Sequence, residues 1–210
     1  MSLLTHWVPA YVALGSNLDG PERQVEAALE RLAGIPGTQR VMNSRLYASQ
    51  PMGPQDQPRF VNAVAGLLTQ LPARELLDEL QRIERDMGRT APLVRWGPRR
   101  IDLDLLLYDD LEVQEPDLIL PHPGIHERNF VLYPLADFAP ALLIPGRGPV
   151  EELARQLGTA GLEPLMRASG SLRGEGLGHV ESAGASFRRC RRPDRRRQDK
   201  SCTATGSELR

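Results

Sequence analysis

Two hydrophobic periods alternate along the first 110 residues of this 210-residue chain. Apolar residues three and four positions apart, as in the stripe from Val25 to Leu32, predict two helices, one opening at Pro21 and the other at Pro72. Short apolar or alternating runs between turn residues predict four strands, at 11–14, 40–49, 60–69 and 101–108. The order strand, helix, strand, strand, helix, strand is that of the ferredoxin-like split β-α-β motif. The pattern therefore predicts an α+β sandwich with a mainly antiparallel sheet and both helices packed on one face, which leaves the other face for a site.

The periodicity weakens after residue 110 and ends near Met166. Residues 129–138 and 150–157 still predict short helices. From Met166 onward Gly, Ser and Arg dominate, and such a composition is typical of a disordered segment. We therefore expect a domain over 1–165 and a disordered Arg/Gly/Ser-rich tail over 166–210. The tail is either a genuine basic arm or a frame-shifted reading of a GC-rich gene.

Composition is that of a soluble globular protein, with 40% hydrophobic and 25% charged residues. No apolar run approaches the roughly 18 residues of a membrane-spanning helix. The first eight residues lack the basic region and the sustained apolar core of a signal peptide. A cytoplasmic protein that binds no membrane is expected.

The net charge of −1 conceals an asymmetry, because the tail is basic and the rest of the chain is acidic. An acidic domain is not expected to bind nucleic acid, so its clustered arginines should have a local target. Both cysteines, Cys190 and Cys202, lie in the tail, which excludes a disulfide framework or a zinc-binding spacing in the domain.

The candidate chemistry is concentrated around Asp102 and Asp104. Side chains alternate along a strand, so these carboxylates share one face, roughly 7 Å apart, while Ile101, Leu103 and Leu105 share the other. Such a pair suits hard cations, and the nearby arginines suit phosphate. The alternative is that the aspartates merely form ion pairs with Arg99 and Arg100. The combination favours a nucleotide site.

The stretch Trp96-Gly97-Pro98-Arg99-Arg100-Ile101-Asp102-Leu103-Asp104-Leu105 resembles the signature of the 6-hydroxymethyl-7,8-dihydropterin pyrophosphokinases, enzymes of the folate pathway. Further segments resemble the family in the same order, at 14–18, 53–58, 60–63, 120–123 and 128–132, so the resemblance covers about 9 to 160. It implies a ferredoxin-like fold. It also implies a transferase, a diphosphokinase that passes the β,γ-diphosphate of ATP to the hydroxymethyl group of the pterin and leaves AMP, a step of tetrahydrofolate biosynthesis.

The resemblance implies roles for individual residues. Asp102 and Asp104 would hold two Mg²⁺ ions, and Arg95 and Arg99 would be catalytic residues that meet the phosphates. The ATP side would comprise Glu84, Arg89, Arg95, Trp96, Arg99, His122 and Arg128. The pterin side would comprise Ser49, Met52, Phe60, Asn62, Trp96 and Phe130, with Trp96 acting as a lid.

Plainer interpretations exist for several of these residues. Phe60 and Phe130 could be core residues, Glu84 could lie on a helix surface, and His122 could be a structural turn residue. The chain also departs from some family members at four positions, which are Ala91, Asp117, Ile119 and Pro123.

Two other classes of protein are compatible with the fold. One is a nucleic-acid-binding module with the tail as an arm, and the other is a relative that has lost catalysis. A nucleic-acid module should expose aromatic residues on its central strands. Here those strands carry Asn62, Asp102 and Asp104, which argues against that module, and intact Asp102, Asp104 and Arg99 argue against lost catalysis. We expect a monomer that acts on ATP and a pterin.

Overall fold

A mainly antiparallel sheet organises the part of the chain that the computed structural model describes, residues 6–89 and 97–166. Arg95, Trp96, Ala91 and the tail from 167 lie outside the described residues. The elements of the predicted split motif are β1 Val8–Ser16, α1 Pro21–Ala33, β2 Thr38–Asn43, β3 Tyr47–Ser49, β4 Phe60–Thr69, α2 Ala73–Asp86 and β5 Asp102–Tyr108. The elements that follow are β6 Val113–Glu115, β7 Leu118–Leu120, the 3-10 helix η1 Ile125–Glu127, α3 Asn129–Ala136, β8 Leu143–Ile144, β9 Gly148–Pro149, α4 Val150–Leu157 and β10 Leu162–Pro164.

The order of the strands confirms the predicted topology. Along the sheet the order is β10-β3-β4-β1-β5, with β2 also paired to β4, and every one of these pairs is antiparallel. The two central strands, β1 and β4, are therefore the first and third of the split motif. The short helices expected near 129–138 and 150–157 are α3 and α4.

One predicted strand is divided. The run 40–49 forms β2 and β3, with a break at Ser44. The Ser44 hydroxyl accepts the hydrogen bond of the Val64 N–H (3.0 Å) and donates to the carbonyl of Arg45 (2.7 Å). Because the side chain takes a bond that a strand carbonyl would normally accept, the ladder is interrupted at this residue.

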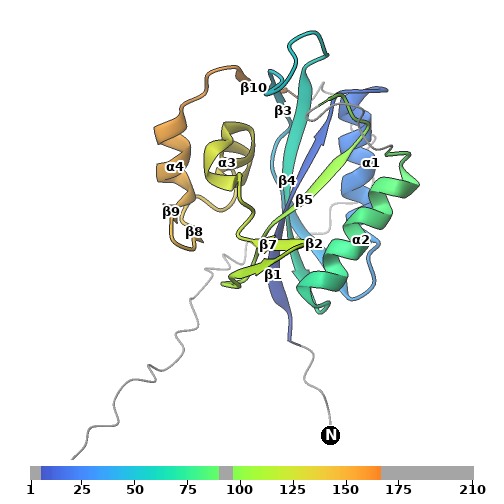
Figure 1. Cartoon of the computed structure of the whole chain (residues 1–210), viewed down its shortest axis with the longest axis vertical. Coiled ribbons are helices and arrows are strands. Elements are labelled where there is room, and N and C mark those ends of the chain that lie inside the picture. Colours follow the sequence, from blue (N-terminus) through green and yellow to red (C-terminus); the bar gives the residue numbers. More distant parts are fainter. Residues whose placement is uncertain (1–5, 90–96, 167–210) are drawn as a thin grey trace, which may run out of the picture. The chain divides into compact units, whose positions relative to one another are not determined.

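Helices lie on both sides of the sheet (Figure 1). The sheet separates two hydrophobic cores. The helices α1 and α2 cover one face as predicted, and Leu103 and Leu105 of β5 point into that core. The other face is not left bare, because α3 packs Val131, Leu132 and Leu135 onto part of it. The uncovered remainder of this second face is where Asp102 and Asp104 project. No helix in the described part of the chain is both long and apolar enough to cross a membrane.

Asp137, at the end of α3, binds the segment between β2 and β3. Its carboxylate accepts hydrogen bonds from the Arg45 N–H (3.0 Å), the Arg45 guanidinium (2.7 Å) and the hydroxyl of buried Tyr47 (2.8 Å). Burial alone would raise the pKa of Asp137, but these hydrogen bonds lower it below its ordinary value. Burial and the bond to Asp137 raise the pKa of Tyr47 to about 12.

We predict that Asp137→Ala lowers the free energy of unfolding by about 1–3 kcal/mol, because the Tyr47 hydroxyl stays buried without its acceptor. The pKa of Asp137 is lower in the folded than in the unfolded chain. The loss should therefore be full above the unfolded pKa of about 3.9 and shrink as the pH falls through the folded pKa. Urea unfolding at neutral and at acidic pH measures both effects, with the exposed Asp110→Ala as control. An equal loss at both pH values would contradict the assignment.

Candidate active site

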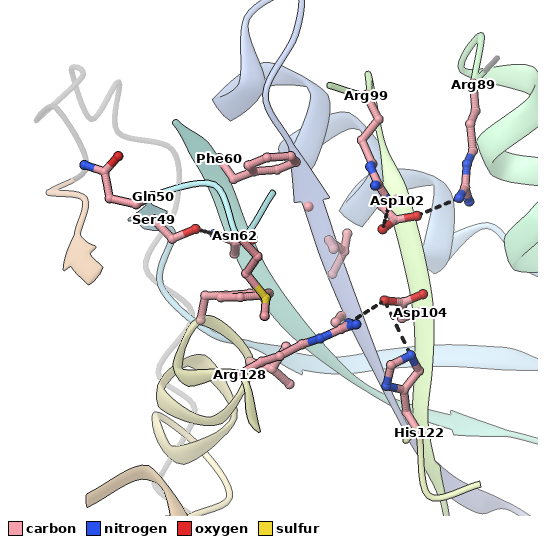
Figure 2. A pocket seen from close by; sticks show the side chains of 16 residues that line it. Ser49, Gln50, Phe60, Asn62, Arg89, Arg99, Asp102, Asp104, His122 and Arg128 are labelled. Carbon is pink, nitrogen blue, oxygen red and sulfur yellow. Dashed lines mark hydrogen bonds and ion pairs between the residues drawn. The ribbon is translucent and has the colours of Figure 1, made fainter. Parts of the chain in front are cut away.

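A cleft opens on the sheet face opposite α1 and α2 (Figure 2). It encloses about 950 Å³ of space, counted out to its open mouth. Its walls come from β1, β4, β5, the end of β3 and the segment after it, and the start of α3. Single residues after α2, before β5 and at both ends of the 122–128 segment complete them. Every predicted site residue in the described ranges lines it except Glu84. These residues are Ser49, Met52, Phe60, Asn62, Arg89, Arg99, Asp102, Asp104, His122, Arg128 and Phe130.

One end of the cleft is charged. Asp102 forms ion pairs through Oδ1 with Arg89 (2.9 Å) and through Oδ2 with Arg99 (2.7 Å). Asp104 Oδ2 lies 3.4 Å from the Arg128 guanidinium. The alternative to metal binding was that the aspartates form ion pairs with Arg99 and Arg100. The pair with Arg99 is present, whereas Arg100 pairs with Asp19. The cleft thus sets three guanidinium groups against two carboxylates.

The charged groups perturb one another's protonation. Burial and the neighbouring carboxylate of Asp102 raise the pKa of Asp104. Burial lowers the pKa of His122, which favours the neutral ring. His122 Nδ1 accepts a hydrogen bond from the Gly124 N–H (3.1 Å), so the proton of the neutral ring is on Nε2. That nitrogen faces Asp104 Oδ2 at 3.8 Å, so His122 presents a donor to the cleft.

Glu84 lies behind the charged end and does not line the cleft. Its side chain is almost fully buried, so it is neither a helix-surface residue nor in direct reach of a ligand in the cleft. Its carboxylate accepts the Leu103 N–H (2.7 Å) and pairs with Arg89. Leu103 stands between Asp102 and Asp104, so Glu84 fixes both the strand that carries the aspartates and one arginine that faces them.

The other end of the cleft is aromatic and amide-bearing. Phe60 from β4 and Phe130 from α3 are half-buried and line the cleft, which is not the full burial expected of core residues. Asn62 is buried, and its Nδ2 donates to Ser49 Oγ (2.9 Å) and to the carbonyl of Tyr47 (3.4 Å). Gly15 faces Asn62, because a Cβ at Gly15 would lie 3.4 Å from Asn62 Oδ1. Two rings, an amide and a hydroxyl thus line this end of the cleft.

Asn17 is a residue to which the sequence pattern assigned no role. Its Oδ1 accepts the Arg99 N–H (2.8 Å), and its Nδ2 donates to Gln57 Oε1 and to the carbonyl of Pro58 (3.1 Å each). This one buried amide joins the turn after β1, the segment before Phe60 and the segment that carries Arg99. A polar residue directly after the end of a strand, two positions after a glycine, was the signal that could have identified it.

The cleft also includes residues that the pattern did not select: Ala13, Leu14, Gly15, Gln50 and Val131. Most are small or apolar residues on strands and helices, where periodicity predicts only burial. They line the cleft, and a local sequence pattern does not predict that role.

Fold and cleft together define a class: a ferredoxin-like α+β protein whose open sheet face carries carboxylates, guanidiniums and aromatic rings in one cleft. A model of the family 7,8-dihydro-6-hydroxymethylpterin-pyrophosphokinase matches residues 11–140, more than half of the chain. The chain therefore belongs to this family.

Two relatives with the same activity in their names are similar over most of their length. The 2-amino-4-hydroxy-6-hydroxymethyldihydropteridine pyrophosphokinase of Haemophilus influenzae is 47% identical over 149 residues, which cover 71% of this chain and 92% of that protein. The enzyme of the same name from Pseudomonas aeruginosa is 50% identical over 155 residues, which cover 74% and 95%.

A solved structure supports the fold. Wild-type HPPK-DHPS of Plasmodium falciparum with pteroate superimposes with a TM-score of 0.59 at 13% identity, over 74% of this chain and 43% of that chain. The chain spans less than half the length of that structure, and at this identity the likeness concerns the fold alone. The predicted ferredoxin-like α+β class is confirmed.

We predict that Glu84→Gln lowers the free energy of unfolding by about 1–3 kcal/mol, because the amide oxygen can still accept both hydrogen bonds but no longer supplies the negative charge that faces the Arg89 guanidinium. Glu79→Gln is the matched control, since Glu79 lies on the same helix and pairs with Arg82 at the surface, where an ion pair contributes less than about 1 kcal/mol. Urea unfolding of both variants measures the difference. Equal losses would show that burial of Glu84 has no energetic consequence.

Proposed function

We propose that this chain, a pyrophosphokinase of the folate pathway, transfers the β,γ-diphosphate of ATP to the hydroxymethyl group of 6-hydroxymethyl-7,8-dihydropterin, giving AMP and the pterin diphosphate. The observation that supports it is that the charged end and the aromatic end belong to one cleft. A polyanion and a flat heterocycle bound at these two ends would meet between Asp104 and Phe130. The hydroxyl oxygen then bonds to the β-phosphorus and releases its proton to solvent, the bond from that phosphorus to the α,β-bridging oxygen breaks, and AMP leaves with that oxygen.

The triphosphate of ATP fits the guanidinium groups of Arg89, Arg99 and Arg128. Guanidinium–phosphate hydrogen bonds are among the strongest in proteins because both partners are charged. In the structure these arginines form ion pairs with Asp102 and Asp104. Each guanidinium is therefore oriented toward the cleft, and its charge is partly neutralised. The neutral His122 adds an uncharged donor at the same end. Arg95, predicted from the family resemblance, would add a further positive charge.

The two aspartates suit a pair of magnesium ions. Among the described residues no three His, Cys, Asp or Glu side chains gather into a closed metal site. Mg²⁺ commonly takes one or two protein carboxylates and fills its octahedron with water and phosphate oxygens, so a ledge of two carboxylates is sufficient. Bound there, Mg²⁺ would neutralise phosphate charge and polarise the attacking hydroxyl.

The pterin fits the aromatic end. Phe60 and Phe130 offer ring faces for stacking, and Asn62 offers an amide that matches the amide-like edge of the heterocycle. Ser49 and Met52 line the same wall. Trp96 is proposed as the lid that excludes water from the reacting atoms.

The reaction itself is the direct test. Purified protein should form AMP and pterin diphosphate in equal amounts from ATP and the pterin in the presence of Mg²⁺. Formation of ADP, or release of AMP that does not depend on the pterin, would contradict the proposal.

We predict that Asp104→Asn lowers turnover by about 100-fold or more, because one carboxylate of the proposed cation pair is lost. Burial already disfavours the ionised form of Asp104, so the free energy of unfolding should change little. Asp110→Asn, at an exposed turn after the same strand, is the matched control. Near-normal turnover of Asp104→Asn in the steady-state assay would show that the proposed role of Asp104 is wrong.

We further propose that the active unit is a monomeric cytoplasmic domain over 1–165, and that the tail over 166–210 takes no part in catalysis. The last described contact of the sheet is the Leu165 N–H bond to the carbonyl of Leu46 (2.8 Å). We predict that a chain ending at Met166 keeps turnover and KM within about twofold of the full chain. A twofold change in rate corresponds to a change of less than about 0.5 kcal/mol in the activation free energy. A steady-state assay of both chains decides, and a loss of more than tenfold would assign the tail a catalytic role.

A further inference from the structure

A second pocket lies next to the aromatic end of the cleft and shares Ser49, Gln50, Met52 and Phe130 with it. Its other lining residues include Asn129, Leu157 and Gly161. The segment 49–52, one wall of the cleft, therefore has open space beside it and is not backed throughout by packed side chains. The position of such a wall must depend on hydrogen bonds more than on packing.

On the side away from β4, with which β3 also pairs, those hydrogen bonds come from β10 and the turn before it. The Gln50 N–H donates to the carbonyl of Gly161 (3.1 Å), and Leu162 pairs with Ser49 across the antiparallel ladder. Gly161 has a φ of +68°, a backbone conformation that favours glycine, and a Cβ there would lie 3.3 Å from Gln50 Cγ, tighter than ordinary van der Waals contact. The wall is thus attached to the turn 158–161.

Asn129 attaches this turn to α3. It is the first residue of that helix, and its Nδ2 donates to the carbonyls of both Gly158 (3.2 Å) and Ala160 (3.0 Å). At the other end of the chain of bonds, Ser49 Oγ accepts from Asn62 Nδ2 (2.9 Å). A continuous path therefore runs from Asn129 through the turn and Ser49 to Asn62, while the next residue of the helix, Phe130, lines the same cleft directly.

We infer that Asn129 is a positioning residue for the pterin end of the cleft: it sets the distance between the α3 wall, with Phe130, and the wall formed by Ser49 and Asn62. A stacked heterocycle bound between two walls tolerates little change in their separation, whereas the turn 158–161 contributes no residue to the charged end. The inference rests on the proposed function, since the ligand at this end is taken to be the pterin.

The test compares two dissociation constants in the full chain, measured by calorimetry. One is for 6-hydroxymethyl-7,8-dihydropterin at saturating Mg²⁺ and non-hydrolysable ATP analogue, and the other is for that analogue with Mg²⁺. In Asn129→Ala, and in the isosteric Asn129→Asp, which turns the donor into an acceptor, the pterin constant should rise about fivefold or more and the nucleotide constant by less than about twofold. Gly161→Ala, which strains the turn from its other side, should have the same signature.

Asn43→Ala is the control, because Asn43 also donates its amide to a backbone carbonyl (Ser44, 3.0 Å) but lies on β2, away from the cleft. It should leave both constants unchanged. If the variants at 129 and 161 weaken both ligands equally, or lower only the thermal midpoint, Asn129 has a structural role alone and the inference is wrong. If the unsubstituted chain binds no pterin, the proposed function fails instead.

Discussion

The structure depends on the alternation of side chains along β5, which places apolar residues on one face of the sheet and carboxylates on the other. Leu103 and Leu105 are buried in the core beneath α2, so Asp102 and Asp104 are forced onto the opposite face, where α3 leaves the sheet uncovered. A slip of one residue in the register would bury both carboxylates among α1 and α2, which would cost several kcal/mol for each charge. Pairing with β1 prevents that slip, and Glu84 adds a bond to the Leu103 N–H from the buried side.

The charged end follows from that constraint. Two carboxylates held on one strand face would repel each other without compensation, and guanidinium groups from three separate segments supply it. Arg89 follows α2, Arg99 precedes β5 and Arg128 precedes α3, so the three parts of the chain converge on the same two aspartates (Figure 2). Asn17 and Asn129 do not form these ion pairs. The side-chain amide of each is hydrogen-bonded to loops that carry or adjoin cleft residues. The site is thus an arrangement of segments around one strand.

Much of this could be predicted from local pattern. The strand-helix order, the shared face of Asp102 and Asp104 and the family signature all depend on residues close in sequence, and α1, α2 and β5 agree with them. Features that depend on distant partners could not be predicted. The break at Ser44 requires the Val64 N–H, the burial of Glu84 requires the Leu103 N–H, and β10 becomes a strand only by pairing with β3. Each of these partners is more than twelve residues away in the sequence from the residue that it binds, so hydrophobic periodicity cannot predict the contact.

We propose that the two aspartates and the facing arginines form one magnesium-dependent nucleotide site. Calorimetric titration of the full chain with a non-hydrolysable ATP analogue, with and without Mg²⁺, tests it most directly. We expect tight binding only with Mg²⁺, and a loss of that dependence in the double variant Asp102→Asn, Asp104→Asn. Nucleotide affinity that is the same with and without Mg²⁺ in the unsubstituted chain would contradict it.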